Sequence, residues 1–102
     1  MATLALTSLD CERKQDVTGA DEPRIKVDGD VVWNGVMKKG DTQILSTRVE
    51  FDGSVAVELE EMNGSNATKI GATAIVKDNG TPGSPVAFKT SGAYYNLHFE
   101  VT

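Results

Sequence analysis

The sequence predicts an all-β protein: an antiparallel, two-sheet β-sandwich of about eight strands, forming a single domain over residues 1–102. Polar and apolar residues alternate with a period of two along most of the chain, which matches the alternation of side chains on a strand. The alternating runs are short and are separated by turn signals that contain glycine. No segment keeps a helical period, so two packed sheets are the simplest way to bury the apolar faces.

The predicted strands cover residues 3–9, 24–27, 31–33, 42–51, 55–60, 70–76, 86–89 and 94–101. An acidic loop over 10–22 separates the first strand from the second and ends at Pro23. Asp28-Gly29 and Asp52-Gly53 are typical of tight hairpin turns, because both residue types tolerate positive φ. We therefore expect a hairpin at each of these pairs.

The later strands show the clearest two-sided patterns. Val55, Val57 and Leu59 alternate with polar or small residues, which is typical of a strand with one face buried. Residues 61–69 contain Asn, Gly and Ser and are predicted to form a loop. Earlier in the chain, Trp33 is in phase with Val31, and we expect it in the core.

The charge balance disfavours several kinds of partner. The chain has 10 Lys and Arg against 15 Asp and Glu, a formal net charge of −5. Nucleic-acid binding and unaided attraction to anionic lipid both need clustered positive charge, so neither is expected. No apolar run approaches the length of a membrane-spanning helix, and we expect no membrane span.

The cysteine content and the first residues of the sequence indicate in which cellular compartment the protein is expected. Cys11 is the only cysteine, so neither an intrachain disulfide nor a cysteine-based metal centre is expected. The first residues lack the basic region and long apolar core of a signal peptide. We expect a soluble cytoplasmic protein if Met1 is native, and a secreted parent is the alternative.

Two segments resemble a known family. Residues 18–27, TGADEPRIKV, are similar to the part of the C-two domain where an acidic loop with Gly, Asp and Pro enters a strand of the form x-V-K-V. Residues 55–63 followed by Ile70-Gly71 are similar to that family's later strand, loop and restart. The C-two domain is a calcium-dependent, lipid-binding β-sandwich. The resemblance implies this fold in its circularly shifted topology, because the chain starts directly on the 3–9 strand and ends on an extra one.

The resemblance also implies a calcium site at the loop ends, where oxygen ligands from separate loops converge. Asp21, or Glu22 beside Pro23, matches the family's signature acid, and Asp10 or Glu12 corresponds to its earlier one. Glu60 falls at the first acid of the later loop. Two further acids of that loop are replaced, the last by Thr68 and the other by Met62 or, with a shorter loop, Asn63, so the site is degenerate and calcium binding is expected to be weak or lost.

The remaining candidate residues favour binding over catalysis. Tyr94, Asn96 and His98 share the polar face of the last predicted strand and form a candidate platform for a sugar or a partner. His98 is the lone histidine, and the sequence supplies no partners that would make it a general base. Adjacent acids such as Glu60 and Glu61 point to opposite faces of a strand and cannot form a catalytic pair. We predict that the protein is not an enzyme.

Three functions stay open from the sequence. The first is a non-catalytic C-two-like binding or accessory module, with calcium as its only candidate cofactor and lipid as a partner only through calcium. The second is a metal-independent structural subunit that self-assembles, or packs on a larger complex, through its sheet edges or outer face. The third is a carbohydrate-binding sandwich that uses the Tyr94, Asn96 and His98 platform.

Overall fold

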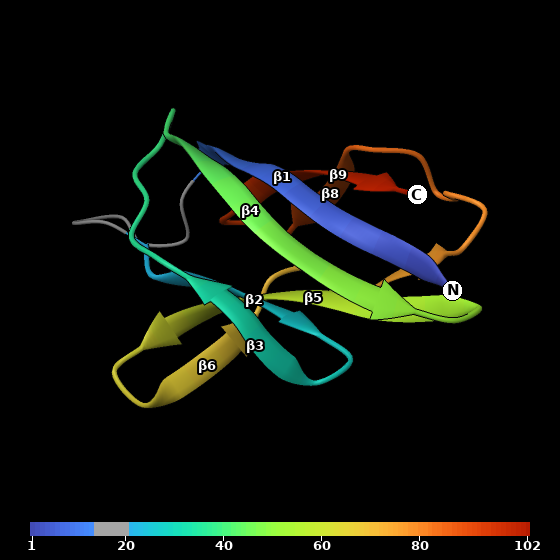
Figure 1. Ribbon diagram of the computed structural model, residues 1–102. Coiled ribbons are helices and arrows are strands. Elements are labelled where there is room, and N and C mark those ends of the chain that lie inside the picture. Colours follow the sequence, from blue (N-terminus) through green and yellow to red (C-terminus); the bar gives the residue numbers. More distant parts are fainter. Residues whose placement is uncertain (14–20) are drawn as a thin grey trace.

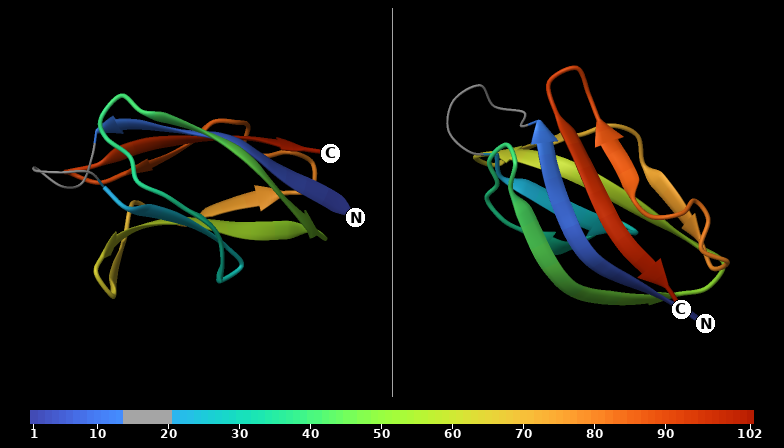
Figure 2. Two further views of the ribbon diagram at one scale, coloured as in Figure 1. Left: turned by 60° about the vertical axis from the view of Figure 1, so that its left-hand side comes forward. Right: turned by 90° about the horizontal axis from the view of Figure 1, so that it is seen from above.

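Two antiparallel sheets lie face to face in the computed structural model, which describes residues 1–13 and 21–102 (Figure 1). Sheet I has the strand order β4-β1-β9-β8, and sheet II has the order β3-β2-β5-β6, with β7 also pairing with β5. The left-hand view of Figure 2 shows the sheets as two layers. The predicted all-β, two-sheet architecture is confirmed at this level.

The described residues form nine strands rather than the predicted eight. Their bounds are Ala2–Arg13 (β1), Pro23–Val27 (β2), Asp30–Asn34 (β3), Thr42–Phe51 (β4), Ser54–Asn63 (β5), Asn66–Lys69 (β6), Ala74–Lys77 (β7), Val86–Lys89 (β8) and Tyr94–Val101 (β9). The additional strand is β6. The predicted loop over 61–69 is instead a hairpin, in which β5 continues to Asn63 and Gly64 turns the chain at a φ of +65°.

The first strand is also longer than predicted. Asp10, Cys11 and Glu12 belong to β1 and not to a loop, because β1 pairs with β9 as far as Arg13 opposite Tyr94. The predicted loop over 10–22 is therefore wrong for its first residues, and residues 14–20 lie outside the described residues.

An irregularity in β1 explains the spacing of its apolar residues. Leu4 and Leu6 are buried two residues apart, and Leu9 and Cys11 are also buried two residues apart. The two pairs are separated by three residues, from Leu6 to Leu9, instead of two. The register of β1 against both β4 and β9 shifts between Leu6 and Ser8, which restores the inward phase. All four side chains therefore face sheet II.

The core fills the space between the two sheets. Val55, Val57 and Leu59 of β5 are buried, as their alternation predicts. Trp33 lies opposite Ile25 and packs against the core. Val31 was expected in phase with Trp33 but is 45% exposed, because a register shift in β3 separates the two residues. No helix among the described residues is long and apolar enough to cross a membrane.

Candidate functional site

Asp21 is the predicted metal ligand whose position differs most from that of an exposed loop acid. Its side chain is fully buried, and its backbone N–H and C=O exchange hydrogen bonds of 2.8 and 2.9 Å with Met37. The Tyr95 hydroxyl of β9 donates a hydrogen bond to Asp21 Oδ2. Asp21 therefore joins the start of sheet II to the inner face of sheet I.

Glu61 is a buried acid that the sequence analysis did not select. It is 3% exposed and follows Val55, Val57 and Leu59 on the inward face of β5. Its Oε2 accepts a 3.0 Å hydrogen bond from the backbone N–H of Glu22. Extending the alternation of β5 by one more step would have assigned Glu61, and not Glu60, to the interior.

Cys11 and Tyr95 complete this buried polar group. Burial raises the pKa of the Cys11 thiol, the hydrogen bond with Tyr95 lowers it, and the nearby acids Asp21, Asp41 and Glu12 raise it. Burial also raises the pKa of the Tyr95 hydroxyl, and its hydrogen bonds to Asp21 and Cys11 add to that effect. Both groups are therefore held in their protonated forms, and Cys11 is a poor nucleophile.

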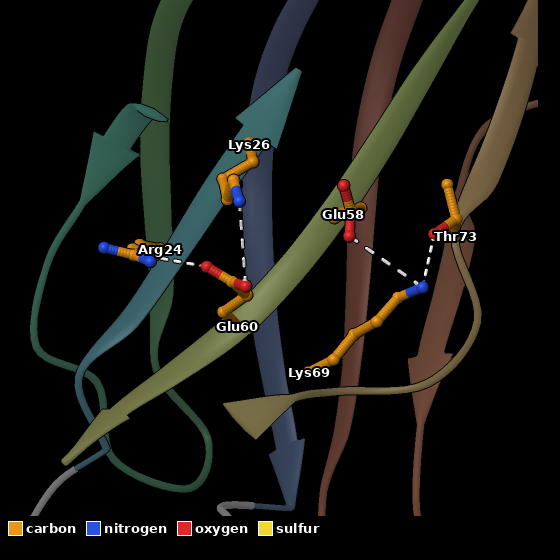
Figure 3. A network of polar contacts seen from close by, with 6 residues as sticks. All are labelled: Arg24, Lys26, Glu58, Glu60, Lys69 and Thr73. Atoms are coloured by element: carbon orange, nitrogen blue, oxygen red, sulfur yellow. Dashed lines mark hydrogen bonds and ion pairs between the residues drawn. The ribbon is translucent and has the colours of Figure 1, made fainter. Parts of the chain in front are cut away.

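Glu60 lies on the outer face of sheet II, the face turned away from sheet I (Figure 3). It pairs with Arg24 directly across the strands, with Nε at 2.7 Å, and with Lys26 at 3.9 Å. Glu58 and Lys69 form a second pair on the same face, and Lys69 also contacts Thr73. Cross-strand pairs of opposite charge stabilise the register of the sheet. The negative charge of Glu60 is therefore already balanced by Arg24 and Lys26 of the same sheet.

Asp10 lies on the outer face of sheet I, between the buried Leu9 and Cys11 of β1. Its Oδ2 is 2.8 Å from His98 Nε2, and its Oδ1 accepts a 2.8 Å hydrogen bond from the Thr42 hydroxyl. His98 thus has a carboxylate partner that the sequence analysis did not find. The two residues are distant in sequence, and only the pairing of β1 with β9 brings them together.

The structure does not bring the five predicted calcium ligands together. Asp10 and Glu60 lie on outer faces of different sheets, and Asp21 lies between the sheets. Glu12 and Glu22 are exposed, and Glu22 lines a pocket of about 320 Å³ with Arg24 and Met62. Within residues 1–13 and 21–102, no three His, Cys, Asp or Glu side chains are grouped so that they could hold a metal ion.

The predicted platform of Tyr94, Asn96 and His98 does lie on one face. All three side chains are half-buried and alternate with the buried Tyr95, Leu97 and Phe99. However, Lys89 Nζ lies 5.0 Å from the centre of the Tyr94 ring, a cation–π contact from the neighbouring strand. A sugar that stacked on this ring face would have to displace Lys89.

The free edge of β4 is the longest in the described structure. β4 spans ten residues and pairs only with β1, so its other edge is the margin of sheet I in the right-hand view of Figure 2. The edge strands β3, β6, β7 and β8 have only four or five residues each. Exposed edge strands offer backbone groups to another strand, and most proteins keep such edges short or interrupt them.

The register of β1 shows which groups of β4 are available. Thr3 exchanges backbone hydrogen bonds with Thr102 on its β9 side, so its partner Glu50 sits in a non-hydrogen-bonded pair. The same alternation gives this position to Arg48. Leu45 and Ser46 of β4 follow at the irregularity, where the register pairs neither with β1. Beyond it, Cys11 exchanges backbone hydrogen bonds with Gly40 and Asp41 on its β4 side, so Thr42 and Ile44 again sit in non-hydrogen-bonded pairs with β1. The backbone N–H and C=O groups of Thr42, Ile44, Arg48 and Glu50 therefore point away from β1, toward the open edge.

Two features of the outer face accompany this edge. Ile44 is 81% exposed, the most exposed large apolar side chain within the described strands. A pocket of about 230 Å³ lies beside the β1 irregularity, lined by Ala5, Ser46, Arg48 and Glu100 among others. The edge thus combines unpaired backbone groups, an exposed apolar side chain and a pocket.

Comparisons with known proteins add no assignment. A scan against protein-family models and a search of curated proteins found no match for the chain.

Proposed function

We propose that the protein is a non-catalytic interaction module that binds a protein partner by adding the partner's strand to the open edge of β4. The observation that supports this proposal is the ten-residue edge, in which Thr42, Ile44, Arg48 and Glu50 direct their backbone groups away from β1. An extended chain that pairs with such an edge gains main-chain hydrogen bonds along its length.

The composition of β4 also supports the proposal. The strand contains no proline, glycine or lysine, and its only charged residues are Arg48 and Glu50. Proteins that must prevent strand addition use prolines, several charges or a β-bulge on such an edge. β4 has only the register irregularity at Leu45 and Ser46, and the exposure of its side chains alternates without a break through that point. The opposite edge of sheet I is different, because β8 has four residues and is preceded by Pro82 and Pro85.

The pocket beside β4 offers a means of selecting the partner. In strand addition, backbone bonds provide affinity, and pockets for alternate side chains provide specificity. The pocket of about 230 Å³ is lined by Ala5 and by the charged side chains of Arg48 and Glu100, among others. Because Leu6 and Leu45 also line it, beside Thr7, Ser46 and Thr47, it can accept an aliphatic side chain such as valine or isoleucine among polar groups.

The experiment uses a soluble, capped ten-residue peptide in which Val and Thr alternate, with one Lys and one Glu. We titrate it into isotopically labelled protein and follow backbone amides by NMR. We expect shifts that saturate, largest at Ile44, Arg48 and Glu50, because these N–H groups face the added strand. Absence of binding at millimolar peptide, or shifts confined to other strands, would overturn the proposal.

A matched pair of variants isolates the backbone contribution. Arg48→Pro removes one outward N–H while leaving the hydrogen bonds to β1, since proline is tolerated on an edge strand when its N–H side faces solvent. Arg48→Ala removes the side chain and keeps the N–H. We expect Arg48→Pro to abolish peptide binding and Arg48→Ala to retain it. Equal binding by both variants would contradict strand addition.

Other functions expected from the sequence stay predictions. The resemblance to the C-two domain, with its circularly shifted topology and calcium-mediated lipid binding, is supported only by the two-sheet antiparallel sandwich, since the five predicted calcium ligands lie apart. Sugar binding is supported by the shared face of Tyr94, Asn96 and His98. The open β4 edge favours the metal-independent interaction module over both.

A further inference from the structure

We infer that the partner strand is β4 of a second copy of this chain, paired antiparallel about a two-fold axis at Ser46. This inference rests on the proposed function and specifies its partner. In this arrangement the two copies of sheet I join into one continuous sheet, and each Ser46 lies opposite Ser46 of the second copy. An interface of this kind is isologous, so every contact occurs twice.

The side chains of β4 favour this register. With the axis at Ser46, Ile44 lies opposite Arg48 of the second copy, and Thr42 lies opposite Glu50 of the second copy. The aliphatic part of Arg48 can cover Ile44, and Thr42, whose hydroxyl already donates to Asp10, places no charge opposite the Glu50 carboxylate. No like charges are directly opposed.

Neighbouring registers are less favourable. An axis at Arg48 places the two Arg48 side chains directly opposite each other, which is destabilising. An axis at Thr47 places Ile44 against the Glu50 carboxylate of the second copy. The axis at Ser46 also pairs the whole segment from residue 42 to residue 50, so it uses nearly all of the open edge.

Ile44 and the pocket beside β4 are complementary in this arrangement. Arg48 contributes to the pocket lining, and Ser46 lines it as well. Ile44 of the second copy lies opposite Arg48 on the same outer face, next to the pocket opening. The 81% exposed side chain of each copy can therefore enter the 230 Å³ pocket of the other. This pairing accounts for an isoleucine that is otherwise turned to solvent.

A single edge-to-edge contact buries less surface than a permanent interface, so we expect a reversible, concentration-dependent dimer. Sedimentation velocity of the intact chain over a hundredfold range of concentration measures it. The expected result is a weight-average mass that rises from monomer toward dimer. Arg48→Pro and Ile44→Lys should each remain monomeric over that range, because the first removes an outward N–H and the second places a cation opposite Arg48 of the second copy. Arg24→Ala, on the outer face of sheet II, should dimerise as the wild type does.

Disulfide trapping tests the register. Directly opposite residues in a hydrogen-bonded antiparallel pair have Cα atoms about 5.5 Å apart, within the range a disulfide spans. Ser46→Cys should form a covalent dimer under mild oxidation. Arg48→Cys, equally exposed on the same edge, should form little. The native Cys11 is buried and common to both variants.

The outcomes separate this inference from the proposed function. A chain that stays monomeric at all concentrations, with no cross-linking of Ser46→Cys, overturns the second copy as partner. If that chain still binds the strand peptide at β4, the proposed function stands without it. Dimerisation with equal cross-linking of Ser46→Cys and Arg48→Cys overturns the register. Dimerisation unaffected by Arg48→Pro and Ile44→Lys places the interface elsewhere and overturns the second copy as the partner of β4.

Discussion

The Tyr95 hydroxyl donates a 2.5 Å hydrogen bond to Asp21 Oδ2, across the space between the two sheets. Tyr95 is the second residue of β9 in sheet I, and Asp21 lies two residues before the start of β2 in sheet II. Both side chains are fully buried. This contact gives a buried carboxylate a donor at the end of the sandwich where the chain crosses from one sheet to the other.

Removing the donor should destabilise the protein. Tyr95→Phe keeps the aromatic ring in the core and deletes the hydroxyl that donates to Asp21. A hydrogen bond to a charged group contributes roughly 1.5–3 kcal/mol, so we expect a loss of about that size in the free energy of unfolding, measured with urea. Tyr94→Phe, on the outer face of the same strand, is the matched control and should change little. A loss below the error of the control would mean that the contact contributes no stability.

Alkaline pH should weaken the fold through the same group. The folded-state pKa values of Cys11 and Tyr95 are raised above 9.0 and 10.0, so the folded protein keeps both protons where the unfolded chain loses them. Their contribution to stability is full below about pH 9 and is lost as pH rises toward the folded-state values. Between the unfolded-state and folded-state pKa values, each group lowers the free energy of unfolding by up to about 1.4 kcal/mol for each pH unit.

The measurement is the urea midpoint between pH 8 and pH 11. We expect it to fall across this range in the wild type and in Tyr94→Phe. Tyr95→Phe should lose stability more gradually with pH, because its tyrosine contribution is absent. A midpoint that stays level to pH 11 would show that Cys11 and Tyr95 are accessible and titrate as they do in the unfolded chain.

Neighbouring residues of β5 should differ sharply in their contribution to stability. Leu59 is fully buried, so Leu59→Ala should cost roughly 2–5 kcal/mol in the free energy of unfolding. Glu58 lies on the outer face and forms a 3.8 Å ion pair with Lys69, so Glu58→Ala should cost less than about 1 kcal/mol. Chemical denaturation of the two variants provides the comparison. Similar losses would contradict the assignment of inner and outer faces.

The sequence predicted strands well where one face is buried, because burial imposes an alternation that can be read directly. Val55, Val57 and Leu59 are such a case. It failed at residues 61–69, where turn-forming residues and short exposed strands have the same composition. β6 is exposed along its whole length, so no hydrophobic pattern marks it, and only its pairing with β5 makes it a strand.

The candidate site depended on contacts that sequence spacing does not contain. Asp10 and His98 are neighbours because β1 pairs with β9, and Glu60 faces Arg24 because β5 pairs with β2. The open edge of β4 is a property of the strand order, since Thr42–Phe51 would have the same sequence at the centre of a sheet. Glu61 is different, because the period of β5 was sufficient to place it inside.

Calcium should have little effect on thermal stability. Asp10 already contacts His98 and Thr42, and Glu60 already pairs with Arg24 and Lys26, so these acids offer a cation little unmet charge. We expect the unfolding midpoint in millimolar calcium to match that in a chelator. A rise that is larger with calcium than with magnesium, and that Asp21→Asn removes, would instead favour the site implied by the C-two resemblance.

Amide hydrogen exchange along β4, measured by NMR in dilute protein, tests the central claim most directly. The account predicts alternation: Val49 and Thr47 amides are protected by hydrogen bonds to β1, while Arg48 and Glu50 amides exchange at rates close to those of exposed loops. At high concentration, Arg48 and Glu50 should become protected as the edge pairs. Uniform protection of all four amides in dilute monomer would contradict an open edge and with it the proposed mode of binding.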